Sequence, residues 1–494
     1  MNTDRRNPWR FVPTVYFAEG LPYVIVNSVS VILYKNMGVS NARIAFWTSW
    51  LYLPWVIKML WGPMVDMYGT RRKWTVYTQA LMALCLAAAA MSLGTPHFFA
   101  ISLAAFAAAA FISATHDIAV DGFYMLALTK KDQAFFVGIR AMFYRFAMIF
   151  GAGFLVYRAG RLQEAFCSVP DSWAIMLMAP ALIFLILFVY HRFVLPYPSE
   201  DISKARAEPL SILRSVGSLC AYLLAAGALI WLFNILPGIW QKLGAAAILT
   251  AALIFICRKY IFPWLKSKIE TEGNSFNDVF VSYFTQDGIG YIIAFILFYR
   301  LAEAMLIKLT SPFLLDGLEK GGLGISTSEV GIIYGTVGMV ALVAGGLLGG
   351  WLISKYGFRR CLWPMVFALH VPDVFYLYMS YAQPALRQIA VFGRDIPFGT
   401  VPLLVAAEQF GYGIGLTAFT VYLMMICKGK YKTAHFAIST GIMALGMMFP
   451  GMISGKIQEA LGYRHFFLAV CILTIPGILV ILRLPIKDAE EKPA

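Results

Sequence analysis

Two carboxylic acids stand one helical turn apart inside an otherwise apolar stretch of the chain. Asp117 and Asp121 belong to the apolar segment 98–128. At this spacing the two carboxyl groups share one face of a helix and lie about 6 Å apart. Two carboxylates this close in a low-dielectric setting tend not to ionise together, so the pair can take up and release a proton. The pattern is typical of a proton-carrying site.

The next apolar segment, 134–157, offers a basic residue for each acid. Counted inward from the facing ends of the two segments, Arg145 lies at the depth of Asp117, and Arg140 lies near the depth of Asp121. We therefore predict the ion pairs Asp117–Arg145 and Asp121–Arg140. The deeper acid, Asp117, is the preferred proton-carrying residue, whereas Asp121 has the better claim to a structural role.

Other ionisable residues also stand within apolar segments, where an unpaired charge costs about 3 kcal/mol or more. Glu19 and Lys58 lie at similar depths in the first and second segments and predict a third ion pair. Arg300 and Glu303 stand three residues apart near the middle of segment 287–316, where Arg300 suits a carboxylate of a substrate. Glu408 lies within a further segment, 401–427.

The histidines and aromatic residues near these charges leave more than one interpretation open. His116, next to Asp117, fits a proton relay and fits equally a histidine packed beside small residues. Tyr144, next to Arg145, could stack on a sugar ring, although most aromatic residues of so apolar a chain must pack or face lipid. His370 and Asp373 are expected to be local partners within one helix.

The composition places these residues in a membrane. Of the 494 residues, 60% are hydrophobic and only 13% are charged, whereas about a quarter are charged in a soluble domain. The segments long enough to span a bilayer are 11–34, 44–66, 74–94, 98–128, 134–157, 172–194, 216–238, 243–263, 287–316, 325–355, 359–382, 401–427, 433–457 and 463–485. The first of them follows a basic, polar start and predicts a membrane helix rather than a cleaved signal peptide.

The order of the segments predicts two halves and an insertion. Residues 1–194 form an N-terminal six-helix half and residues 287–494 a C-terminal six-helix half. Between them, residues 195–286 contain polar linkers and two extra transmembrane helices, at about 216–238 and 243–263. The fold class is thus an all-α polytopic membrane protein of 14 membrane helices. Repeated six-helix halves are typical of transporters that bind their substrate between the halves near the bilayer midplane.

The charge balance orients the chain. The net charge is +14, and its basic residues concentrate in short loops on the side of both termini. Positive loops mark the cytoplasmic side, so both termini are expected in the cytoplasm and nucleic acid is not expected as a partner. The seven cysteines show no paired spacing for a metal site.

A short glycine- and arginine-containing loop occurs once in each half. Its residues are Gly62, Asp66, Gly69, Arg71 and Arg72 in the first half, and Gly350, Gly357, Arg359 and Arg360 in the second, with Ser354 in the place of Asp66. The glycines permit close helix packing and a tight reversal, and the arginines hold the loop on the cytoplasmic side. The motif resembles the gating signature between helices 2 and 3 of the major facilitator superfamily, with its echo between helices 8 and 9.

Longer matches extend this resemblance to the AmpG-type muropeptide permeases, which are related to acetyl-coenzyme A transporters. The matching stretches are 20–22, 58–63, 113–118, 299–304, 329–331 and 417–419, together with Asp66, Asp121, Tyr144, Arg145 and Glu408. The resemblance implies proton-driven import of N-acetylglucosaminyl-1,6-anhydro-N-acetylmuramoyl peptides. Glu19, where a small or hydroxyl residue is usual, and His116, where glutamine is common, depart from the family pattern.

From the residues and the resemblance together we assign roles. The predicted proton-coupling residues are Asp117, Asp121 and Glu303. The predicted substrate-binding residues are Glu19, Lys58, His116, Tyr144, Arg145, Arg300 and Glu408. The expected partners are a small muropeptide-like substrate, protons and the lipid bilayer, without a cofactor or metal, because a proton gradient drives the cycle.

The expected location is the bacterial inner membrane, and the expected protein is not an enzyme. Three alternatives remain. The first is a major facilitator for a sugar, a peptide or an acyl-coenzyme A ester. The second is a membrane-embedded transferase, which the internal repeat and the absence of an Asp-rich or HExxH loop disfavour. The third is a sensor that does not transport.

Overall fold

The structure, a computed structural model, describes residues 6–58, 61, 65, 69–201, 282–391, 394–427 and 432–485. The predicted extra helices at 216–238 and 243–263 lie outside these residues, as do Gly62 and Asp66 of the first loop motif. The described residues are mostly helical, in agreement with an all-α polytopic protein.

The first bundle contains residues 6–201. Its helices are η1 (Pro8–Arg10), α1 (Val12–Val24), η2 (Ile25–Val29), α2 (Ser30–Asn36), α3 (Asn41–Trp50), α4 (Leu53–Ile57), α6 (Arg71–Ser92), α7 (Phe98–Ala127), α8 (Lys130–Ile149), η4 (Phe150–Leu155), α9 (Val156–Phe166) and α10 (Val169–Val194). Several of these elements run into one another, so that Pro8–Asn36 and Lys131–Phe166 are each one continuous membrane-length helix.

The second bundle contains residues 282–485. Its elements are α15 (Ile289–Phe298), α16 (Leu301–Leu315), η6 (Leu318–Lys320), α17 (Thr327–Ile332), η7 (Ile333–Gly338), α18 (Met339–Tyr356), α19 (Phe358–His370), α20 (Asp373–Ala382), β1 (Arg387–Val391), β2 (Arg394–Phe398), α21 (Thr400–Met425) and α22 (Lys432–Ile481). α22 contains two helices that meet at a kink at Gly462, where φ is 72°.

Hydroxyl residues in the loops set where several helices begin. The side chains of Thr70, Thr129 and Ser168 each accept a hydrogen bond from the first turn of the helix that follows. Ser326 and Glu329 form a complete capping box at the start of α17. Each cap satisfies a backbone N–H that would otherwise lack a partner, which stabilises the helix start by about 1 kcal/mol.

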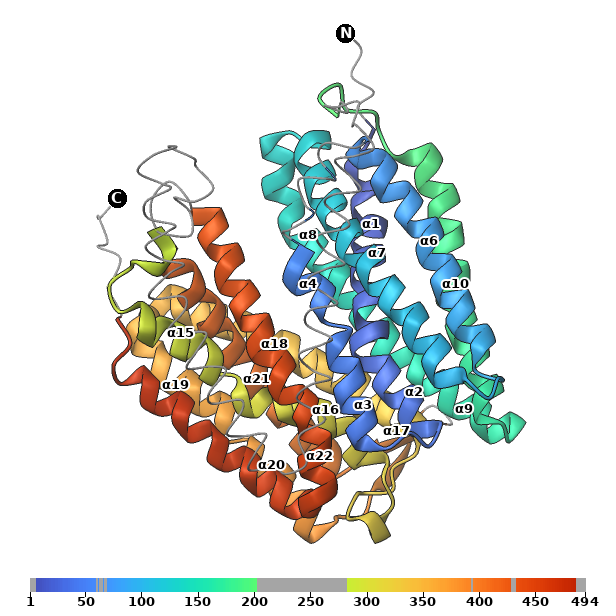
Figure 1. Cartoon of the computed structure of the whole chain (residues 1–494), viewed down its shortest axis with the longest axis vertical. Coiled ribbons are helices and arrows are strands. Elements are labelled where there is room, and N and C mark those ends of the chain that lie inside the picture. Colours follow the sequence, from blue (N-terminus) through green and yellow to red (C-terminus); the bar gives the residue numbers. More distant parts are fainter. Residues whose placement is uncertain are drawn as a thin grey trace, which may run out of the picture.

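The two bundles lie side by side and are joined at one end (Figure 1). They meet at the end away from the chain termini and diverge toward the end where the N-terminus lies (Figure 1). A hydrophobic core continues from one bundle to the other near the joined end, and includes Leu33 and Ile44 of the first and Phe313 and Phe467 of the second.

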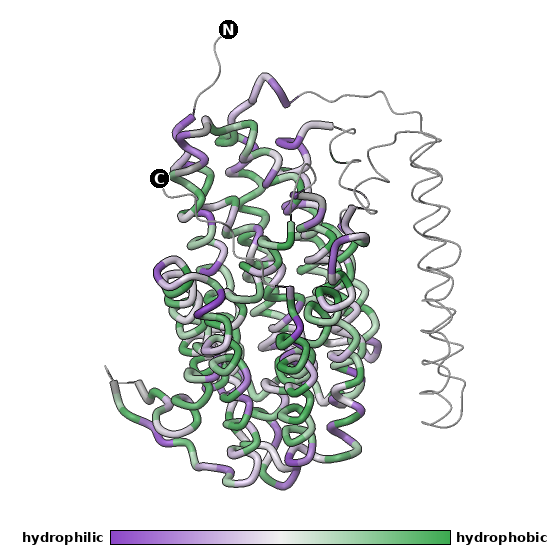
Figure 2. The backbone as a smooth tube through the Cα atoms, turned by 90° about the vertical axis from the view of Figure 1, so that its left-hand side faces the viewer, coloured by the Kyte–Doolittle hydropathy of each residue, from purple (hydrophilic) through white to green (hydrophobic). Residues whose placement is uncertain are grey.

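The outer surface is apolar, as a lipid-facing surface must be. Hydrophobic residues run along most of the helices in Figure 2, and large side chains such as Leu84, Phe193, Leu347 and Leu482 are about two-thirds exposed or more. Within the described residues, eight helices are long and apolar enough to cross a membrane.

Two features of the second bundle depart from the segments expected from the sequence. The predicted segment 287–316 is broken into α15 and α16 at Tyr299 and Arg300, and Arg300 occupies the N-cap of α16. The stretch after α20 forms an antiparallel β-hairpin, in which Ile389 of β1 is paired with Ile396 of β2. The hairpin was not predicted, because a strand pair this short leaves no clear alternation of apolar and polar residues.

Candidate functional site

Backbone contacts between the bundles close one end of the molecule. In η7, a Cβ atom at Gly335 would collide with the carbonyl oxygen of Ala152 in η4. In α22, a Cβ at Gly455 would collide with the carbonyl oxygen of Asn41 at the start of α3. Only glycine permits these approaches, so the two bundles are packed backbone to backbone at these points.

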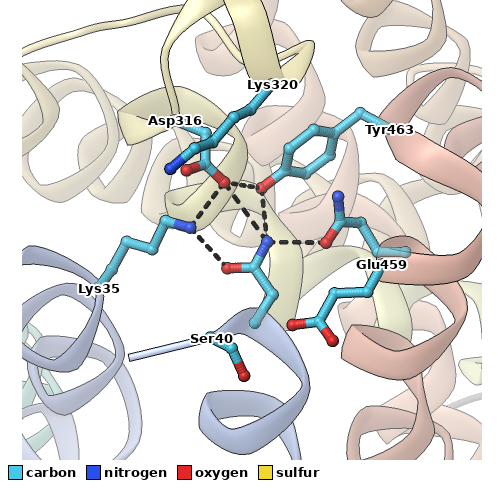
Figure 3. Close-up of a pocket in the computed structure, with 8 residues that line it drawn as sticks. Lys35, Ser40, Asp316, Lys320, Glu459 and Tyr463 are labelled. Carbon is cyan, nitrogen blue, oxygen red and sulfur yellow. Dashed lines mark hydrogen bonds and ion pairs between the residues drawn. The ribbon is translucent and has the colours of Figure 1, made fainter. Parts of the chain in front are cut away.

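A buried polar network reinforces the same end and is drawn in Figure 3. Lys35 Nζ of the first bundle lies 2.6 Å from Asp316 Oδ2 of the second, and their side chains are only 14% and 6% exposed. The Tyr463 hydroxyl donates to the same carboxylate at 2.7 Å. Asn41 donates to Gln458 at 2.7 Å and to Tyr463 at 2.9 Å. We call these five residues the closed-end network.

A cavity of about 430 Å³ lies between the bundles, lined by both of them. The first bundle contributes residues such as Tyr23, Tyr52 and Arg145, and the second contributes residues such as Arg300 and Tyr412. Its volume is in the range of small-molecule sites in proteins. A site shared between two bundles that meet at one end is the arrangement that alternating access requires.

The charged residues that line this cavity, within the described part of the chain, are all cations: Arg145, Arg300 and Lys308. Arg300 donates a hydrogen bond to the Tyr412 hydroxyl, and Lys308 donates to Thr48 at 3.2 Å. None of the three lies within ion-pair distance of a carboxylate among the described residues. The cavity therefore presents cationic side chains that no described carboxylate contacts directly.

Aromatic side chains form one wall of the cavity. Tyr23 is the centre of a cluster, with ring centroids 6.2 Å from Tyr52, 5.3 Å from Trp55 and 6.4 Å from Tyr144. Rings of this kind stack on apolar or sugar faces, and their hydroxyl groups supply hydrogen bonds. Tyr144, a predicted substrate-binding residue, lines the cavity beside Arg145.

Next to the cavity, the first bundle holds five charged residues that we call the first-bundle cluster: Glu19, Lys58, Asp117, Asp121 and Arg140. Arg140 lies 3.2 Å from Asp121, which confirms that predicted pair, and the Tyr16 hydroxyl also donates to Asp121 at 3.2 Å.

The predicted pair Asp117–Arg145 is wrong. Asp117 lies 3.5 Å from Lys58 instead, while Arg145 faces the cavity and its guanidinium contacts the sulfur of Met148 at 3.8 Å. Equal depth in two helices does not bring two side chains together unless both helices also present them to each other.

Glu19 lies in the electrostatic field of Asp117, Asp121 and Lys58, but the predicted pair Glu19–Lys58 does not form at ion-pair distance. The first-bundle cluster thus contains three carboxyl groups and two cations. Tyr144 connects it to the cavity, since this residue lines the cavity and interacts electrostatically with both Asp117 and Glu19.

In the second bundle, the predicted residues Arg300 and Glu303 are directed to different surroundings. Arg300 lines the cavity, whereas Glu303 is fully buried and is not among the residues that line it. Glu408, also buried, accepts hydrogen bonds from Tyr376 at 3.2 Å and from Gln409 at 3.0 Å. Gln409 in turn lines the cavity, so Glu408 lies one side chain behind the cavity wall.

The structure places His116 outside the cavity. Its Nε2 lies 3.2 Å from the amide nitrogen of Gln79, whose oxygen lies 2.9 Å from Nδ1 of His191. All three residues are buried between α6, α7 and α10. The arrangement supports the packing interpretation of His116 rather than contact with a substrate.

The first loop motif holds α6 against the end of α10. Arg72 donates to the carbonyl oxygens of Leu195 at 3.2 Å and Arg192 at 2.6 Å. The carboxylate of Asp201 accepts from the backbone N–H groups of Arg71 and Arg72 at 2.8 and 2.9 Å. An acid at a helix start stabilises its unpaired N–H groups and its dipole. Gly69 has a φ of 90°, which lets the chain turn into α6.

The second loop motif is more open. Gly357 ends α18 with a φ of 80°, and the side chains of Arg359 and Arg360 are exposed. Among the described residues, a Cβ at Gly350 would meet nothing within 4 Å, so this part of the chain does not show the predicted close helix contact there. Gly345 provides a close helix contact instead, because a Cβ added at this position would collide with the carbonyl oxygen of Phe410 in α21.

Sequence reasoning missed the closed-end network. Lys35 and Asp316 each stand at the end of an apolar segment, where a charge is expected to face water. The signal that was present is the glycine-rich run after Asp316, which permits a tight chain reversal at the joined end. Tyr52 and Tyr412 carried no signal, because tyrosines are common in such helices.

Comparison with known proteins agrees with this geometry. No protein-family model matches the chain. A transporter of Rickettsia conorii named AmpG 4 is 22% identical over 482 residues, covering 95% of this chain and 94% of the relative. The anhydromuropeptide permease of Escherichia coli is 23% identical over 474 residues, covering 94% of this chain and 77% of the relative.

Solved structures show the same fold. A D-xylose-proton symporter superposes with a TM-score of 0.63 at 12% identity, covering 96% of both chains. The nucleoside transporter NupG gives a TM-score of 0.58 at 14% identity, covering 95% of this chain and 98% of that one. The chain therefore has the major facilitator fold and is similar to AmpG-type transporters along nearly its whole length. It is a multi-pass membrane protein.

Proposed function

We propose that this protein is a transporter that imports anhydromuropeptides in symport with protons. The observation that carries the proposal is the cationic cavity between the bundles, next to a cluster with more carboxyl groups than cations. The similarity to a permease named for anhydromuropeptides supports this substrate.

The cavity suits a sugar that carries carboxylates. Arg145, Arg300 and Lys308 supply positive charge, with no carboxylate of the described residues at ion-pair distance, and a guanidinium binds a carboxylate with two parallel hydrogen bonds. The cluster around Tyr23 supplies aromatic faces and hydroxyl groups for sugar rings. In a substrate with N-acetyl sugars and a peptide that ends in carboxylates, the sugars can contact the aromatic cluster and the carboxylates can contact the cationic residues.

The first-bundle cluster suits one transported proton. Lys58 pairs with Asp117 and Arg140 pairs with Asp121, which leaves Glu19 without a cation of its own at ion-pair distance among the described residues. A carboxyl group removed from water and from cations is more stable neutral than charged. A proton shared by Glu19 and Asp117 balances the cluster. Its release leaves excess negative charge beside Tyr144 at the cavity wall.

The joined end of the molecule acts as the gate of the cycle. With both termini in the cytoplasm, as the basic loops predict, the closed-end network lies on the periplasmic side and the structure represents an inward-facing state. Loading from the periplasm then requires Lys35 and Asp316 to separate. The inner membrane of a bacterium is the location where a proton gradient drives this import.

The test is uptake of radiolabelled anhydromuropeptide into proteoliposomes, with and without an inward proton gradient. We expect the gradient to drive accumulation by the wild type and by Asp287→Asn, which changes an exposed carboxylate. Asp117→Asn should lower accumulation but retain exchange of labelled for unlabelled substrate, because the amide imitates the protonated acid. Equal accumulation with and without the proton gradient would refute proton coupling.

A folded wild type that takes up no anhydromuropeptide would refute the substrate. Sugars, peptides and acyl-coenzyme A esters would then be compared by ligand-induced thermal stabilisation. The cationic cavity predicts that anionic compounds stabilise the protein more than their neutral analogues, because they neutralise Arg145, Arg300 and Lys308.

A further inference from the structure

A second group of ionisable residues is buried in the second bundle, and the proposed cycle leaves most of it unused. Glu303 of α16 and Asp373 at the start of α20 are both 0% exposed. Glu408 of α21 is 2% exposed and His370 at the end of α19 is 5% exposed. Four different helices thus bring three carboxyl groups and an imidazole into one interior region. We call these residues the second-bundle cluster.

The three acids of this cluster interact electrostatically, and His370 lies beside one of them. His370 Nδ1 is 3.8 Å from Asp373 Oδ2. Glu303 interacts with Asp373, and Glu408 interacts with both of these acids. Further residues on the neighbouring elements also face the cluster, namely Tyr299, Arg300, Tyr334, Tyr376 and Cys471.

Most of the polar atoms in the cluster have no hydrogen-bond partner among the described residues. Within the described residues, both carboxylate oxygens of Glu303, both of Asp373 and both ring nitrogens of His370 are buried without a hydrogen bond. Glu408 differs, because Tyr376 and Gln409 donate to it. An ionised carboxylate buried without hydrogen bonds is strongly destabilised.

Among the described residues, one cation, Arg300, interacts with an acid of this cluster. The field of Arg300 reaches Glu303, but its guanidinium donates to Tyr412 at the cavity wall. One guanidinium cannot neutralise three carboxylates. The cluster is therefore stable only when protons occupy part of it.

We propose that Glu303, Asp373 and His370 form a second proton-binding site, which carries a transported proton in addition to the one held by Glu19 and Asp117. This inference rests on the proposed symport. On loading, one carboxylate or the imidazole gains a proton from water, and on release the same O–H or N–H bond breaks. Asp373 and His370, which the sequence suggests are only local helix partners, are assigned to the transport cycle.

The second-bundle cluster is connected to the cavity through its wall. Arg300, Tyr334 and Gln409 line the cavity and also face Glu303 or Glu408. A substrate carboxylate that binds Arg300 cancels part of the positive field at Glu303. The loss of that field favours a proton on the cluster, so substrate and proton bind together.

The test measures how steeply accumulation depends on the proton gradient. Proteoliposomes are held at zero membrane potential with a gradient of one pH unit. Two protons per substrate predict about 100-fold accumulation at equilibrium, and one proton predicts about tenfold. The wild type and the control Asp287→Asn should reach about 100-fold. Asp373→Asn should reach only about tenfold and keep its exchange activity.

His370→Asn and Glu303→Gln provide the same readout if Asp373→Asn does not fold. About tenfold accumulation by the wild type, or about 100-fold by the folded variants, would overturn the second site and leave the symport intact. Accumulation by the wild type that ignores the gradient would instead overturn the symport itself. The two failures are therefore distinguishable.

Discussion

Replacing Asp316 by asparagine should open the end of the molecule at which the two bundles meet. The Asp316 carboxylate accepts hydrogen bonds from Lys35 at 2.6 Å and from Tyr463 at 2.7 Å. Lys35 belongs to the first bundle and Asp316 to the second, so their ion pair exists only in the closed arrangement. An asparagine can still accept from Tyr463, but it leaves the lysine without its counter-charge.

The size of the effect follows from the burial of the pair. Removing one member of a buried ion pair costs about 3–5 kcal/mol. The two side chains retain 14% and 6% exposure, which favours the lower end of this range. A loss of about 3 kcal/mol shifts the equilibrium between closed and open arrangements about 150-fold. Asn36 and Thr327, which are hydrogen-bonded across the bundles at 2.8 Å, still support the closed arrangement.

Distances between spin labels report this shift directly. Phe166 in α9 and Leu318 in η6 are more than half exposed and belong to different bundles, so each can carry a label in a cysteine-free background. Asp316→Asn should increase the population with a long distance between the labels. The control Glu319→Gln, at an exposed carboxylate of η6, should not. Equal distance distributions in the Asp316 variant and the wild type would refute a role for this ion pair in closure.

Three further substitutions separate structural from transport roles. Asp121→Asn removes an ion pair with Arg140 whose side chains are 34% and 49% exposed. We therefore expect accumulation to persist and the free energy of unfolding to fall by at most about 1 kcal/mol in thermal denaturation. Loss of accumulation would place this acid in the proton path. Arg72→Lys loses the planar guanidinium that donates to two carbonyl oxygens at the end of α10. The melting temperature and the transport rate should therefore fall, while substrate affinity in detergent is retained. A large loss of affinity would contradict this. Gly335→Leu should weaken closure because the leucine collides with the backbone of η4, and the distance between the two spin labels should increase. An unchanged distance would show that the interface can accommodate the side chain.

Some of the charged site could be predicted from the sequence because it depends on local properties. The pair Asp121–Arg140 followed from depth in two consecutive helices, which an antiparallel connection keeps side by side. Arg145 and Arg300 were recognised because a cation within an apolar segment needs water, a ligand or a counter-ion. Both of them line the cavity.

Other parts of the site depend on how helices are rotated about their axes. Depth alone could not show that Asp117 pairs with Lys58 and leaves Arg145 to the cavity. Likewise, Arg300 and Glu303 stand three residues apart, but the break before α16 directs them to different surroundings. The sequence provides the spacing and only the packing provides the rotation.

The sequence by itself determined a polytopic helical membrane protein and the positions of its membrane charges, because length, hydropathy and helical period are properties of single segments. The tertiary structure alone decided the partners of those charges and the place where the bundles close. Lys35 and Asp316 are 281 positions apart in the chain, and Asp373 interacts with Glu303 from another helix. Such contacts arise from the packing of whole helices, which no local pattern in the chain specifies.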